Sequence, residues 1–175
     1  MPEWIEPVFD RTEEDVEYAK RNMLDDGGYE KAYFTTNDGF YFTDAAYRHI
    51  LFLVVSEHKG AYNASDLNRV NGNMLFLKDV LADNGITVEL KTASRVWQMM
   101  DIPTAADFES YLNDVSAIRN AVTQMSDTPH VPSKDKFDYL KANDIEKILY
   151  DTYRLVYRVR DSFYYSGEIY AGEVS

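Results

Sequence analysis

The residues of this chain that could do chemistry are its histidines and carboxylates, and their spacing favours no particular reaction. His49 and His58 lie nine residues apart, on different faces of a helix, and neither belongs to an HExxH pattern. We interpret both as structural or exposed residues. Asp38 and Asp44 are of the type that binds calcium, but their spacing does not match an EF-hand loop. The chain has no cysteine and hence no thiolate zinc site, so we expect no metal and no cofactor.

Paired carboxylates are the other chemical possibility, because a glycoside hydrolase uses two of them. The pairs Asp25-Asp26 and Asp101/Asp107 have a simpler explanation as loop and helix-cap residues. Acids distant in sequence can also meet in space, so a glycoside hydrolase-like enzyme with dispersed carboxylates stays an alternative. No GxGxxG, P-loop or GxSxG pattern occurs. The prediction is therefore a protein that is not an enzyme.

Composition excludes several classes of partner. A formal charge of −12 repels nucleic-acid phosphates and anionic membrane surfaces, so we expect neither as a partner. The hydrophobic content of 45% argues for a folded globule. The N-terminus, MPEWIEPVFD, is acidic and interrupted by proline, so we expect no signal peptide there. The longest apolar run, Ile50 to Val55, is far too short to span a membrane.

An aromatic β-hairpin is predicted over residues 31–43. Asn37-Asp38-Gly39 is a strong turn signal, and it separates two runs rich in tyrosine and phenylalanine. Such a cluster could form a sugar-binding platform, so a carbohydrate-binding receptor-recognition module is an alternative function. A hairpin that simply packs on the helices explains the same residues.

The clearest helix is predicted between Gly60 and Gly85. Asn63 and Asp66 have the spacing of a capping box, and Asn84-Gly85 supplies a left-handed stop. Between these signals runs one apolar stripe, formed by Leu67, Val70, Met74, Leu77 and Leu81.

The same reasoning predicts a mainly α fold: a helical bundle of three long helices plus two shorter ones, with a minor β-hairpin and extended termini. The long helices are expected at 64–83, 105–122 and 139–162, and the shorter ones at 13–24 and 44–57. Along the chain this gives an extended arm (1–11), a helical region (12–123), a linker (124–137), a C-terminal helix on the same core (138–163) and an extended tail (164–175).

Four segments, taken together, resemble a family of small tail-region proteins encoded by bacteriophages and prophages. They are FDRTEEDVEYAK, KGAYNASDLNRV, DIPTAADFESYLNDVSAIR, and NDIEKILYDTY with YYSGEIYAGE. The resemblance implies a non-enzymatic virion structural protein of the tail or baseplate region, located in the virion and assembled in the cytoplasm of a bacterial host. The chain departs from the family pattern between Gly28 and His58, where the aromatic hairpin stands.

A tail component works through repeated contacts, so we expect other virion or tail proteins as partners, with a homo-oligomer as a further option. The two termini are the candidate contact elements, because aromatic residues are enriched at interfaces. The alternative is that both termini fold back on the bundle. The candidate contact residues are Trp4, Ile5, Val8 and Phe9 in the arm and Tyr164, Tyr165, Ile169 and Tyr170 in the tail.

Overall fold

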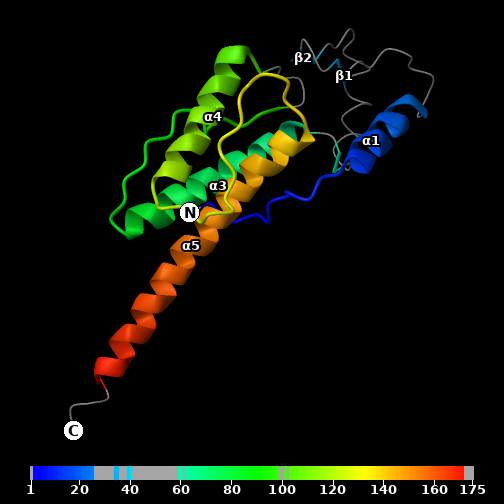
Figure 1. Ribbon diagram of the computed structural model, residues 1–175. Helices are drawn as coiled ribbons and strands as arrows, with labels where there is room; N and C mark the ends of the chain where they lie inside the picture. Colours follow the sequence, from blue (N-terminus) through cyan, green and yellow to red (C-terminus); the bar gives the residue numbers. More distant parts are fainter. Residues whose placement is uncertain are drawn as a thin grey trace.

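The structure, a computed structural model, describes residues 2–25, 34–35, 39–40, 59–60, 62–98, 101 and 103–171; for 20–25, 34–35, 39–40 and 163–171 it describes the backbone alone. Within these residues the chain is mainly helical, as predicted. Figure 1 shows α3, α4 and α5 packed together, with α1 to one side of them. The helices are α1 (Glu13–Asp25), α3 (Ala64–Asp83), α4 (Ala105–Asn120) and α5 (Tyr139–Ala171).

Helix α3 begins and ends where its sequence predicts. The side-chain oxygen of Asn63 accepts from the Ser65 N–H at 2.8 Å, and the Asp66 carboxylate accepts from the Asn63 N–H at 2.9 Å. After the helix, Gly85 takes a φ of +79°, which only glycine adopts at little cost. The predicted stripe is confirmed as core: Leu67 is 8% exposed, and Val70, Met74, Leu77 and Leu81 are 0% exposed.

Helices α3 and α5 run in the same direction along each other. Arg69 of α3 contacts Glu146 of α5, and Phe76, farther along α3, contacts Tyr153, farther along α5. The two helices therefore keep one register over at least two turns. The two contacts are seven residues apart on each helix, which is one step of three plus one of four. Such positions lie on the same face of a helix, so both contacts belong to one shared face.

Helix α4 runs in this direction too. The hydroxyl of Tyr111, in α4, lies 2.6 Å from that of Tyr62, just before α3. Past the end of α4, the Gln124 amide donates to the Thr152 hydroxyl on α5 at 3.2 Å. Parallel neighbours need connections that travel back along the bundle, and the segments before and after α4 are long enough to do so (Figure 1).

The predicted linker is an irregular segment that packs on both neighbouring helices. The Thr128 hydroxyl donates to the buried carboxylate of Asp151 on α5 at 2.9 Å. Phe137, at the other end of the segment, meets Phe108 of α4 edge to face, with ring centroids 4.9 Å apart. The linker is therefore part of the folded unit and does not separate two bodies.

The prediction of an extended tail from residue 164 is wrong for residues 164–171, which continue α5 to Ala171. The tail contains Gly167, which costs about 1 kcal/mol in a helix relative to alanine. That cost is small because extending an existing helix adds one hydrogen bond for each residue that it fixes. Residues 172–175 lie outside the described part of the chain.

Two short strands, β1 (Phe34–Thr35) and β2 (Gly39–Phe40), pair antiparallel, with Phe34 opposite Phe40. The turn between them and the outer parts of the predicted hairpin 31–43 lie outside the described residues, so the hairpin stays a prediction. The predicted helix at 44–57 also lies outside them.

Candidate functional site

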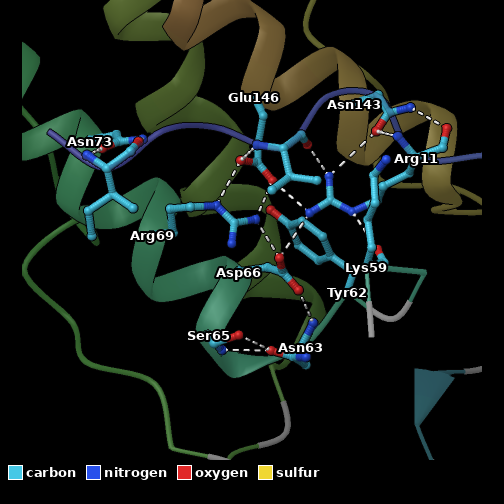
Figure 2. A network of polar contacts seen from close by, with 12 residues as sticks. Arg11, Lys59, Tyr62, Asn63, Ser65, Asp66, Arg69, Asn73, Asn143 and Glu146 are labelled. Carbon is cyan, nitrogen blue, oxygen red and sulfur yellow. Dashed lines mark hydrogen bonds and ion pairs between the residues drawn. The ribbon is translucent and has the colours of Figure 1, made fainter. Parts of the chain in front are cut away.

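A buried cluster of four charged side chains joins the N-terminal arm to α3 and α5 (Figure 2). Nη2 of Arg11, in the arm, donates to Asp66 at 2.9 Å and to Glu146 at 2.8 Å. Arg69 of α3 donates to the same two carboxylates, and its Nε and Nη2 lie 2.9 and 2.7 Å from Glu146. The side chains of Arg11 and Glu146 are 1% and 0% exposed. The cluster thus holds two cations and two anions.

Backbone N–H groups also donate to the two carboxylates. Oε2 of Glu146 also accepts from the Val8 N–H at 2.7 Å, and Oδ2 of Asp66 accepts from the Asn63 N–H at 2.9 Å. Each carboxylate oxygen therefore already accepts from an arginine or a backbone N–H. Both acids are thus held by arginines and backbone donors, which is the arrangement of a structural ion-pair cluster.

Burial and neighbouring charge hold the groups around the cluster in one protonation state. Burial, with the nearby charge of Glu146, raises the pKa of the Tyr62 hydroxyl far above its ordinary value. Burial, with the adjacent Tyr62, does the same to the pKa of Tyr111. Burial alone would lower the pKa of Arg69, but the hydrogen bonds and charge of Glu146 outweigh it and raise that pKa. The two tyrosines are therefore neutral and Arg69 is charged at neutral pH.

Two asparagines bind the backbone of the arm. Asn73 of α3 accepts from the Ile5 N–H at 2.9 Å and donates to the Ile5 carbonyl at 2.7 Å. Asn143 of α5 accepts from the Arg11 N–H at 3.1 Å and donates to the Arg11 carbonyl at 2.9 Å. Each amide satisfies both backbone groups of one arm residue, as the neighbouring strand of a sheet would.

An aromatic row continues from the arm along α5. Trp4 stacks on Tyr153 with ring centroids 4.3 Å apart and an interplanar angle of 13°, and Phe76 lies 5.7 Å from Trp4. Tyr157 follows Tyr153 at 4.4 Å, and the Arg160 guanidinium lies 4.1 Å above the Tyr157 ring. These rings are only partly buried, so the row forms a surface where the arm meets the outer half of α5.

The arm folds back on the bundle, and the structure places its four candidate contact residues there. Trp4, Val8 and Phe9 are half-buried, with Phe9 packed 5.0 Å from Tyr150, whereas Ile5 is 51% exposed. Contact of the arm with another subunit stays a prediction. The tail residues Tyr164, Tyr165, Ile169 and Tyr170 belong to α5, and their side chains lie outside the described part.

The acidic pair Asp101 and Asp107 consists of loop and cap residues, as predicted. Asp101 accepts from the Gln98 N–H at 2.9 Å, and Asp107 accepts from the Thr104 N–H at 3.0 Å. Among the described residues, no three His, Asp or Glu side chains gather closely enough to hold a metal ion. The other residues considered for chemistry, His49, His58, Asp38, Asp44, Asp26 and the Asp25 side chain, lie outside what the structure describes.

Sequence reasoning missed Arg11, Asn73, Asn143 and Glu146. For the three that lie on α3 and α5, a signal exists as a second stripe beside the apolar one. Its members recur at steps of three and four, the spacing of one helix face. They are Asp66, Arg69, Asn73 and Phe76 on α3, and Asn143, Glu146, Tyr150, Tyr153 and Tyr157 on α5.

Comparison of the chain with known proteins finds no match to a family model, a curated protein or a solved structure. In the part of the chain that the structure describes, no helix has both the length and the apolar character that a membrane crossing needs.

Proposed function

We propose that this chain is a non-enzymatic structural component of a bacteriophage or prophage virion, in the tail or baseplate region, that acts through protein–protein contacts. The four segments that resemble phage tail-region proteins support the virion assignment. Other virion or tail proteins, and a second copy of the chain, are the proposed partners, with no nucleic acid or membrane among them. In this proposal the full fold is three long helices, with shorter ones at 13–24 and 44–57 and a hairpin at 31–43.

The observation that carries the contact role is that α5 extends beyond the helices it packs on. It has 33 residues against 20 for α3, so it is about 50 Å long against about 30 Å. Figure 1 shows its C-terminal part projecting past the other helices. Along its apolar stripe Ile148 and Leu149 are 0% exposed, Val156 is 7% exposed and Val159 is 46% exposed.

The apolar positions of the projecting segment make it the proposed contact surface. Most helical stability comes from packing an apolar face. The segment after Val156 contains Val159, Phe163 and Tyr170, which continue the spacing of the buried stripe. A second protein packed on this face would bury the stripe and stabilise the helix.

The test combines particle composition with a matched pair of exposed valines. Val159 lies on the projecting stripe, whereas Val96, 75% exposed, lies in the loop before α4. In a host that carries the phage or prophage, gradient-purified particles should contain the chain by mass spectrometry. Val159→Asp should reduce its incorporation, and Val96→Asp should not, with equal helix content by circular dichroism. Particles that lack the wild-type chain, or that accept both variants equally, would contradict the proposal.

A further inference from the structure

The arm is held by a receptor built from α3, α5 and Lys59, which precedes α3 and accepts from the Arg11 side chain through its carbonyl. Ile5, Val8 and Arg11 each give backbone groups to side chains of these two helices, namely Asn73, Glu146 and Asn143. Among the described residues, none of the arm before Thr12 makes a backbone-to-backbone hydrogen bond to another described residue outside the arm. Side chains that bond to the main chain of an extended segment are a mode of peptide recognition.

The receptor also fixes which segment it accepts and in which register. Trp4 fills the aromatic position against Tyr153, and the Arg11 guanidinium fills the site between Asp66 and Glu146. The occupant must therefore present a tryptophan and an arginine seven residues apart on an extended backbone. Pro2 and Pro7 favour that extended form before binding, which lowers the entropy lost on docking.

We propose that the same receptor takes the arm of a second copy of this chain, so that two copies exchange their arms reciprocally. An identical arm restores each contact that the exchange removes, and such a contact closes with twofold symmetry. Helix α1 directly follows the arm and would move with it, and an identical α1 would restore the close packing of Asp15 against Gly60 of the receptor side. The sequence between α1 and Lys59, residues 26–58, is 33 residues long, and a chain of that length spans about 50 Å even as a helix.

Local concentration decides between the two arrangements. A segment tethered to its own receptor has an effective concentration on the order of millimolar. Exchange is therefore expected when copies approach that concentration, as neighbours in an assembled particle do. This inference deepens the proposed function, because it names one partner of the contact surface as a second copy.

An exposed ion pair provides a reporter of exchange that needs no mutation. Lys59 Nζ lies 2.8 Å from the Asp10 carboxylate, so a carbodiimide can couple arm and receptor through an amide bond. Unlabelled and ¹⁵N-labelled full-length chains are co-refolded from urea, concentrated to about 1 mM and cross-linked. An arm docked on its own chain gives Asp10–Lys59 peptides of one isotope, and an exchanged arm gives mixed peptides.

The pair Lys134–Glu109 is the matched control, because it is also exposed and also 2.8 Å long but joins the linker to α4. We expect mixed Asp10–Lys59 peptides to rise with concentration toward about half of the total, and Glu109–Lys134 peptides to stay unmixed. Light scattering should show a dimer of twice the 20.2 kDa chain. Asp10–Lys59 peptides of a single isotope at about 1 mM, or equal mixing at both pairs, would overturn the inference. The cross-linking test uses purified protein, so its result is independent of the particle analysis. Exchange can be absent while the chain is found in particles, and exchange can occur while the chain is absent from them.

Discussion

Replacing Glu146 with glutamine tests whether the buried cluster holds the fold together. Glu146 accepts four hydrogen bonds: one from Arg11, two from Arg69 and one from the Val8 N–H. A glutamine oxygen accepts about two, and its amide nitrogen would face donors. At about 1.5–3 kcal/mol for each lost bond to a charged group, two losses cost about 3–6 kcal/mol. Breaking one partner of a buried ion pair costs about 3–5 kcal/mol, which agrees.

The assay is urea unfolding followed by far-ultraviolet circular dichroism, with the free energy of unfolding from linear extrapolation. Glu146→Gln should lower it by about 3–5 kcal/mol, out of the roughly 5–15 kcal/mol typical of a domain. Glu109→Gln is the control, because Glu109 bonds to Lys134 at 2.8 Å but its side chain is 58% exposed. That variant should leave the urea midpoint nearly unchanged.

A double-mutant cycle separates the cluster from simple loss of packing. Arg11→Met leaves one uncompensated anion, and Glu146→Gln leaves one uncompensated cation, whereas the double variant is neutral again with Arg69 and Asp66. The double variant should therefore lose less than the sum of the single losses, with a coupling of about 0.5–3 kcal/mol. A loss below about 1 kcal/mol for Glu146→Gln, together with additive singles, would refute the reasoning, because it would mean that water solvates these charges.

Three smaller changes test the packing and the caps. Leu77→Ala should cost about 2–5 kcal/mol in urea unfolding, whereas Leu140→Ala, at a 55% exposed position, should cost less than about 0.5 kcal/mol. Gly60→Ala should destabilise the protein because the new Cβ would lie 2.0 Å from a backbone oxygen of α1; Gly72→Ala, with open space, should stabilise α3 by about 0.5–1 kcal/mol. Similar losses at both positions of either pair would contradict these assignments. In the capping box of α4, a backbone hydrogen bond lowers the pKa of Asp107 below 3.8. The unfolded chain then binds more protons, so Asp107→Asn should destabilise the protein at pH 7, and the difference should shrink as the pH falls below about 4. A constant difference between pH 7 and pH 3 would contradict this.

The elements that could be predicted from the sequence are those whose signals are local. The capping box at Asn63, the helix-cap role of Asp107 and the glycine stop at Gly85 each depend on a few neighbouring residues, and the structure confirms all three. The end of α5 was missed because Gly167 and the polar-aromatic residues near it weigh only weakly against helix, while propagation from a long packed helix favours it.

The candidate site could not be predicted in the same way, because its contacts join distant segments. Arg11 meets Asp66 across 55 residues and Glu146 across 135 residues. The capping box already explained why an aspartate stands at position 66, so the sequence offered no reason to expect that Asp66 also pairs with Arg11. The stripes of polar and aromatic residues on α3 and α5 were visible in the sequence, but only the parallel direction of the two helices places them beside each other and around the arm.

The charges in the cluster fit a role in register better than a role in bulk stability. The arm carries Trp4, Ile5, Val8 and Phe9, and a purely apolar groove would accept such a segment in several positions. Well-packed apolar residues of similar volume often stabilise as well as a buried ion pair, but they do not fix alignment as sharply. One buried arginine between Asp66 and Glu146 allows a single register, because a slip of one residue would leave two anions with one cation in the interior. The alignment is then the same whether the arm belongs to its own chain or to a second copy, which is the condition that reciprocal exchange requires.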